Sequence, residues 1–105
     1  MTAVAEPERP DAGFAVRPHE PSPTESIQLF DCSHDPRKVG IAWRAWDFGD
    51  GSTGVGSSPV HRYAHAGRYT VTLTLATFDG RVGCVTQVVD VRRRSERHRH
   101  ALGRP

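Results

Sequence analysis

The sequence predicts an all-β protein that folds as a single antiparallel sandwich of about seven strands. Short apolar and β-branched segments recur along the chain between Gly, Pro and Asp turn signals. The longest of them, residues 69–77, alternates with the period of a half-buried strand, and one face carries Tyr69, Val71, Leu73 and Leu75. No segment shows the 3.6-residue period of an amphipathic helix. These three observations together favour strands throughout.

Length and composition indicate one small domain between two tails. The chain has 105 residues, 36% of them hydrophobic, which is enough for a single core of marginal stability. The first residues are rich in Pro, Glu and Ala and offer little to bury. We therefore expect a disordered segment over residues 1–13, a β-sandwich over 14–91 and a disordered basic tail over 92–105.

The first strands are short and lie between prolines. Residues 14–16 are apolar and are followed by Pro18, which suits an edge strand. A proline-rich connection then leads to a strand over residues 26–31, with Ile27 and Leu29 expected to point inward. Residues 35–38 form a polar turn.

The central strand is expected over residues 41–48, and strict alternation fails in it. Trp43 and Trp46 are three residues apart and fall on opposite faces of a regular strand. A β-bulge would bring both indoles inward, or Trp43 lies on an outer sheet face. The sequence leaves both arrangements open.

The second half of the chain predicts a long hairpin. Residues 52–58 are rich in Gly and Ser and are expected to form a flexible loop, followed by a short strand over 59–63. The long strand over 69–77 ends at Asp79-Gly80, a hairpin turn signal, and residues 81–91 return as the last strand.

Three motifs follow one another in the second half of the chain: W-D-F-G-D-G at 46–51, H-x-Y at 61–63 and G-x-Y-x-V-T-L-T at 67–74. The resemblance they carry covers roughly residues 25–91. Their marker residues are Trp46, Asp47, Phe48, Gly49, Asp50, Gly51, His61, Tyr63, Gly67, Tyr69 and Val71. The combination closely resembles the polycystic-kidney-disease-type (PKD) domain. That resemblance implies an immunoglobulin-like β-sandwich with Trp46 in its core, serving as a non-catalytic module of extracellular enzymes, surface-layer proteins and receptor ectodomains. It further implies a protein or carbohydrate partner, and no cofactor.

Asp47 and Asp50 are the obvious pair of carboxylates. A glycosidase pair must be set apart across a cleft, whereas these two share one tight turn. Calcium is the second alternative, but D-F-G-D-G-S lacks the ligand number of a calcium loop and its distal Glu. We expect both side chains to accept hydrogen bonds from turn amides.

His61 and His65 have the H-x-x-x-H spacing that binds zinc on a helix. Here the spacing spans a strand end and a turn, so we expect the rings to diverge and bind no metal. Tyr69, near the start of a long strand, is placed like the tyrosine corner of immunoglobulin-like sandwiches, whose hydroxyl bonds back to the main chain.

Cys32 and Cys84 are the only cysteines. Their expected positions allow a disulfide, which would contribute roughly 4 kcal/mol at best by chain entropy. Two separate thiols in a reducing compartment are the alternative. The sequence leaves the pairing open.

Charge is distributed unevenly. Residues 1–91 hold eight Lys/Arg and eleven Asp/Glu, a net −3, whereas residues 92–105 hold six Arg and one Glu, a net +5. The tail could bind nucleic acid or another polyanion through Arg92, Arg93, Arg94, Arg97 and Arg99. No aromatic residue is interleaved, so base stacking is not expected, and a solvated tail without a ligand is the simpler interpretation.

The first residues show neither a basic start nor an apolar run, so no secretory signal peptide is predicted. Family resemblance implies an extracellular or cell-surface location, while the missing signal favours an intracellular or particle-associated one. A structural subunit of a phage-like or secreted particle is therefore the alternative function. Membrane insertion and enzymatic activity are not expected.

Overall fold

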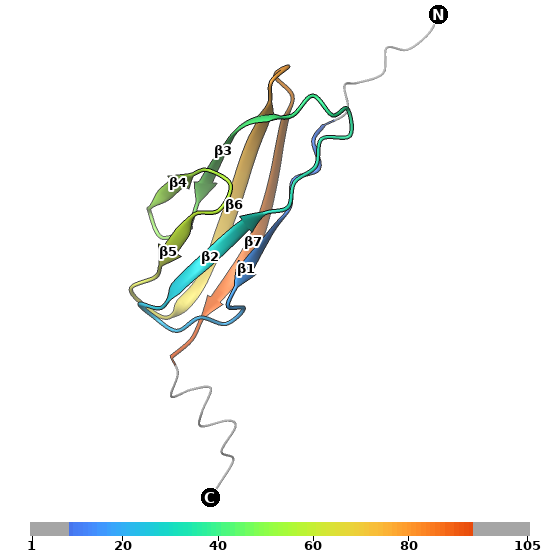
Figure 1. The fold of residues 1–105 in the computed structure, drawn as a ribbon. Coiled ribbons are helices and arrows are strands. Elements are labelled where there is room, and N and C mark those ends of the chain that lie inside the picture. The colour runs from blue at the N-terminus through green and yellow to red at the C-terminus, as the bar shows by residue number, and fades with distance from the viewer. Residues whose placement is uncertain (1–8, 94–105) are drawn as a thin grey trace, which may run out of the picture.

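Two antiparallel sheets face each other in the structure, a computed structural model in which residues 9–93 are described (Figure 1). The described residues contain seven strands and no helix, so the predicted all-β sandwich is confirmed. Residues 1–8 and 94–105, which include Arg94, Arg97 and Arg99 of the basic tail, lie outside the described residues.

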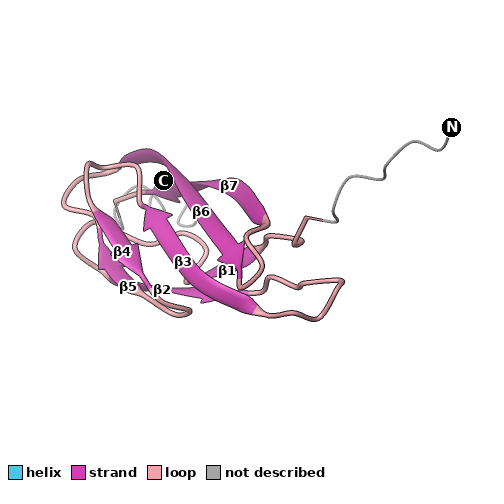
Figure 2. Cartoon of the chain, turned by 90° about the horizontal axis from the view of Figure 1, so that it is seen from above, coloured by secondary structure: helices cyan, strands magenta, loops and turns pink. Residues whose placement is uncertain are grey.

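One sheet has three strands in the order β1-β2-β5, and the other has four in the order β4-β3-β6-β7. Figure 2 shows the two layers from above. The strand bounds are β1 Phe14–Arg17, β2 Ser26–Asp31, β3 Ile41–Asp47, β4 Thr53–Val55, β5 Val60–Arg62, β6 Gly67–Thr77 and β7 Val82–Val91.

The core fills the space between the sheets, and the period-two pattern determines which side chains enter it. Leu29, Val71, Leu73 and Leu75 are fully buried, in keeping with the alternation of β2 and β6. The Phe14 ring meets the Trp46 indole edge-on, with centroids 5.1 Å apart at 79°. The two sheets therefore share one apolar core.

The structure separates the two tryptophans. The pairing of β3 with β6 shifts register between Ile41 and Trp43, and regular pairing follows from there. Trp46 is buried at 1% exposure, whereas Trp43 is 49% exposed on the opposite side of the strand. The irregularity thus precedes both indoles and does not bring Trp43 inward.

A tight turn joins β6 to β7. Gly80 has a φ of +88° and donates its N–H to the Thr77 carbonyl at 3.0 Å. From that turn the two strands pair over ten consecutive residues without a register shift. This hairpin runs the length of the described sandwich (Figure 1).

Two expectations about irregular segments are wrong. Residues 9–13 were expected to be disordered, but Asp11 exchanges two backbone hydrogen bonds with His34, at 2.7 and 2.9 Å. The loop over 52–58 contains β4, whose three residues pair with β3. Composition missed both because backbone pairing needs only a neighbouring strand, whatever the side chains.

The described chain enters the sandwich near the β6–β7 turn and leaves at the other end, after β7 (Figure 1). No helix among residues 9–93 is long and apolar enough to cross a membrane.

Candidate interaction surface

The W-D-F-G-D-G motif forms the turn that follows β3. Trp46 donates its indole N–H to the Gly56 carbonyl at 2.7 Å, which ties the core to the β4–β5 loop. Asp47 Oδ1 accepts the Gly49 amide at 2.9 Å, and Asp50 Oδ1 accepts the Ser52 amide at 3.1 Å. Both carboxylates are therefore engaged in the turn itself.

Asp50, Ser52 and His61 form a small polar cluster at this turn. His61 Nε2 lies 2.8 Å from Asp50 Oδ2 and 3.4 Å from Ser52 Oγ, while Ser52 Oγ donates to Asp50 Oδ1 at 2.5 Å. Burial raises the pKa of Asp50, but hydrogen bonds from Ser52 and His61 outweigh it and hold that pKa below its ordinary value.

This cluster has the residue types of a catalytic triad but not its geometry. A triad histidine contacts its carboxylate through one ring nitrogen and its serine through the other. Here the same Nε2 faces both partners, so no proton can pass from Ser52 through the ring toward Asp50. The Phe48 ring stacks on His61 at 4.1 Å and fixes the imidazole in place. The arrangement clamps the turn to β5.

His61 and His65 do not share a site. His65 is exposed, and its carbonyl accepts the Tyr69 hydroxyl at 2.7 Å, a bond to the main chain four residues upstream. Among residues 9–93, no cluster of three or more His, Cys, Asp or Glu side chains could hold a metal ion.

Tyr63 contacts the turn after β3 and is itself packed against Tyr69. Tyr63 is buried and donates its hydroxyl to the Phe48 carbonyl at 2.7 Å, and its ring stacks on Tyr69 at 4.2 Å. Burial, followed by the nearby charge of Asp50, raises the pKa of Tyr63 well above its ordinary value. Its phenol thus stays neutral and serves packing.

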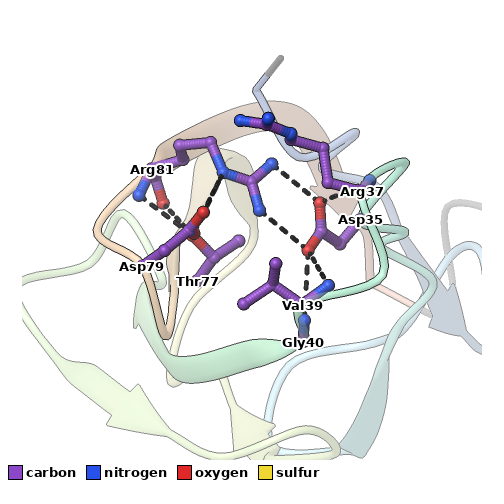
Figure 3. Close-up of polar contacts among 7 residues, drawn as sticks. All are labelled: Asp35, Arg37, Val39, Gly40, Thr77, Asp79 and Arg81. Atoms are coloured by element: carbon purple, nitrogen blue, oxygen red, sulfur yellow. Dashed lines mark hydrogen bonds and ion pairs between the residues drawn. The ribbon is translucent and has the colours of Figure 1, made fainter. Parts of the chain in front are cut away.

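A second polar cluster, which the sequence analysis did not anticipate, joins the loop before β3 to the β6–β7 turn (Figure 3). Arg81 makes two hydrogen bonds to Asp35, at 2.8 and 3.0 Å, and two to Asp79, both at 3.0 Å. Asp35 also accepts three backbone amides, those of Arg37, Val39 and Gly40. Arg81 and Asp35 are both buried.

The sequence predicts Asp35 and Asp79 in separate turns and gives no reason to pair them. The only available signal was an arginine placed directly after a turn, within a strand that is otherwise uncharged up to Asp90. Because Arg81 hydrogen-bonds to carboxylates of two separate turns, the cluster holds these turns together at one end of the sandwich.

The two cysteines are free thiols and both are exposed, so the disulfide that the sequence left open is not formed. Cys84 pairs with Thr74 and points away from the core, on the outward side of the four-stranded sheet. Cys32 follows β2 in the other sheet, where its amide bonds to Gly13. The side-chain alternation of β7 turns Cys84 away from that sheet.

Of the proposed anion-binding residues, Arg92 and Arg93 are described and exposed. Arg92 pairs with Asp90 at 3.0 Å, and its amide bonds to the Pro21 carbonyl at 3.0 Å. This arginine therefore belongs to the end of the folded domain.

The outward side of the four-stranded sheet, here called the outer face, carries more exposed large apolar side chains than the other sheet among the described residues. Strand pairing places its residues in adjacent rows: Trp43, Ala45, Asp47, Thr53, Val55, Arg68, Thr70, Thr72, Thr74, Ala76, Val82, Cys84, Thr86, Val88 and Asp90. Trp43, Val55, Val82 and Val88 are between 44 and 78% exposed. The exposed apolar residues of the other sheet are Phe30 and Val60.

Trp43 is the most prominent group on the outer face. Its cross-strand neighbour is Ala76, and Ala45 follows two residues along the same strand. Because both neighbours are small, the indole is left uncovered. The sequence alone assigns no role to Trp43, since its exposure depends on where the irregularity in β3 falls.

Comparison with known proteins identifies relatives of this chain. The model of the family described as "PKD domain" matches residues 7–92. A microbial collagenase from Vibrio alginolyticus is 41% identical over 44 residues, which are 42% of this chain and only 5% of the collagenase.

Solved structures with a similar fold include two PKD domains. The PKD1 domain of Vibrio anguillarum Epp superposes with a TM-score of 0.73 and 31% identity, over 84% of this chain and 99% of that one. The PKD1 domain of the Vibrio cholerae metalloprotease PrtV gives 0.70 and 30%, over 80% and 98%. A structure described under the promiscuous specificity of carbohydrate-binding modules of the β-sandwich superfamily gives 0.79 and 28%, over 86% of this chain and 37% of that one.

Proposed function

Because this chain belongs to the PKD domain family, we propose that it is a non-catalytic interaction or spacer module that contacts a protein or carbohydrate through the outer face. The observation that carries the proposal is the half-exposed indole of Trp43 on a sheet surface without charged neighbours in its row. An indole of this kind offers a large, rigid apolar surface at low entropic cost.

The engagement of the motif residues with one another supports a non-catalytic role. Asp47 and Asp50 each accept a main-chain amide of their own turn, and Asp50 also contacts the histidine of the H-x-Y motif. A spacer role is supported by the path of the chain, which enters and leaves the sandwich at opposite ends (Figure 1).

The relatives suggest two classes of ligand. One structural neighbour is described as a carbohydrate-binding module, and one sequence relative as a collagenase. A pyranose ring stacks on an exposed indole, and a collagen-like chain would pack its prolines against the same surface. Both ligands belong outside cells, so we propose an extracellular setting.

Retention on insoluble polysaccharide and on fibrillar collagen tests this proposal. Trp43→Ala is expected to weaken retention on one of the two by about tenfold, since a central aromatic contact is worth about 1.4 kcal/mol or more. The matched control is Phe30→Ala, which removes an exposed aromatic from the other sheet and should leave retention unchanged. Equal retention of both variants would contradict the proposal that the ligand binds the outer face. Retention of neither ligand by the unaltered chain would favour a spacer role.

A further inference from the structure

The free edge of β7 differs from the other three sheet edges. Strands β4 and β5 are three residues long, and β1 has four and is followed by Pro18. The Phe14 carbonyl of β1 also accepts the Gln87 side chain at 2.5 Å. Short strands, prolines and side-chain caps are the usual protection of sheet edges against pairing with another chain. By contrast, β7 extends over ten residues.

The free edge of β7 carries none of these protective features. Residues 82–91 contain no Pro, Lys or Arg, and the only charged residue is Asp90, near the end. The ten pairs with β6 have no bulge that would twist the edge away. Among the described residues, backbone hydrogen bonds from within β7 reach only β6.

The register with β6 shows which backbone groups face this edge. Thr77 donates its N–H to the Arg81 carbonyl at 2.8 Å, so this pair is a hydrogen-bonded one. Hydrogen-bonded and non-hydrogen-bonded pairs alternate along an antiparallel ladder. The N–H and C=O groups that point away from β6 are therefore those of Val82, Cys84, Thr86, Val88 and Asp90.

We propose that a second copy of this chain binds here, by antiparallel pairing of the two β7 strands about a two-fold axis at Thr86. This register joins the two four-stranded sheets into one continuous sheet and uses all five N–H and all five C=O groups of each edge. It closes on itself, because each copy occupies the free edge of the other.

The side chains of β7 are compatible with pairing to themselves. In the proposed register Thr86 faces Thr86 of the second copy, a favourable cross-strand pair, and Cys84 faces Val88. The two Asp90 carboxylates lie at opposite ends of the pair, roughly 27 Å apart at the rise of a β-strand, so screening removes their repulsion. No other charge of the strand is brought near its copy.

A groove of about 240 Å³ lies beside this edge, between β1 and β7, with Phe14, Val16, Gln87 and Val89 among its lining residues. The Gln87 side chain reaches across this groove to the Phe14 carbonyl, but no described residue other than those of β6 makes a backbone hydrogen bond with β7. The interface is independent of the proposed ligand contact, because Trp43 lies two strands away from the free edge.

Sedimentation equilibrium of the full chain over a range of concentrations tests the pairing. We expect a concentration-dependent dimer that Val88→Lys weakens by at least about tenfold, since a lysine on an edge strand opposes strand addition. Thr70→Lys is the matched control: Thr70 is the cross-strand partner of Val88 on the same outer face, but it lies inside the sheet. It should leave the dissociation constant within about twofold.

Cysteine cross-linking tests the register even if the lysine variant fails to fold. In a chain with Cys32→Ser and Cys84→Ser, Thr86→Cys should form a disulfide-linked dimer under mild oxidation, because directly opposed residues lie at disulfide distance. Thr70→Cys in the same background should not. A monomer at all concentrations up to about 1 mM, a dimer unaffected by Val88→Lys, or a dimer lost in Trp43→Ala but not in Val88→Lys would overturn the proposal.

Discussion

Gly49 shows how closely one residue of the family motif is constrained. Its φ is +85°, and a Cβ added there would lie 3.0 Å from the Thr70 amide nitrogen and still closer to the Thr70 carbonyl oxygen. Both contacts are to main-chain atoms of β6, which cannot move without breaking the ladder. The turn after β3 therefore packs directly against β6 at this point.

We predict that Gly49→Ala lowers the free energy of unfolding by about 3 kcal/mol or more, because strain from positive φ adds to a main-chain clash. Gly51→Ala is the control, since Gly51 has a φ of +94° and open space around its Cβ position. It should cost about 1–2 kcal/mol. Urea unfolding of both variants measures the difference, and equal losses would contradict the clash.

Both His61 and Asp50 belong to the family motifs, but the motifs do not show that the two side chains are in contact. Eleven positions separate the two side chains in sequence, and the turn and β5 bring them to 2.8 Å. Ser52, which the sequence places in a flexible loop, completes the cluster.

At the scale of elements, the buried contact between Asp35 and Arg81 determines how one end of the sandwich holds together. Hydrogen bonds from Arg81 outweigh the opposing effect of burial, and with those from the Gly40, Arg37 and Val39 amides they hold the pKa of Asp35 well below its ordinary value of 3.8. A carboxylate with a lowered folded-state pKa stabilises the fold above its unfolded pKa, and this contribution is lost as the pH falls.

The predicted consequence is a free energy of unfolding that decreases as the pH is lowered below about 4. Asp35→Asn should destabilise the protein at pH 7. It should also weaken the dependence of the free energy of unfolding on pH below about 4, because the titrating group is gone. Chemical unfolding at a series of pH values between 2 and 7, within the range of carboxylate titration, gives both quantities. The same pH dependence in the variant would mean that other carboxylates, such as Asp50, determine the loss of stability in acid.

The free edges of the two sheets differ in strand length, in capping and in charge. Three of them are short or capped, and β7 is long and uncharged up to Asp90. Sequence alone could not distinguish them, because a strand becomes an edge only through the order of strands in its sheet.

For the molecule as a whole, the state of the cysteines distinguishes a fold held by packing alone from one held by a cross-link. Both thiols are free and exposed, so the stability of this small domain rests on its single core and its two polar clusters.

We predict that alkylation of the native protein under non-reducing conditions adds two groups per chain, one at Cys32 and one at Cys84, as read by intact mass. The Cys32→Ser/Cys84→Ser variant should unfold at nearly the same denaturant concentration, since exposed substitutions usually change stability by no more than about 0.5 kcal/mol. A native protein that resists alkylation until it is reduced would show that the thiols are joined.

The sequence by itself determined the all-β class, six of the seven strands, the β6–β7 turn and the family. These follow from local rules: a period of two, glycines at turns, and motif residues whose neighbours lie close along the chain. It could not place β4 or order residues 9–13, because their pairing uses backbone groups that every sequence carries.

Only the tertiary structure decided which tryptophan is exposed, which carboxylate meets Arg81, and which strand forms a long free edge. Each depends on distances between segments far apart in the chain: the register shift at Ile41, the approach of two loops 46 residues apart, and the position of β7 at the end of its sheet. The proposed surfaces for a ligand and for a second copy both arise at this level, because exposure is a property of packed sheets and not of single strands.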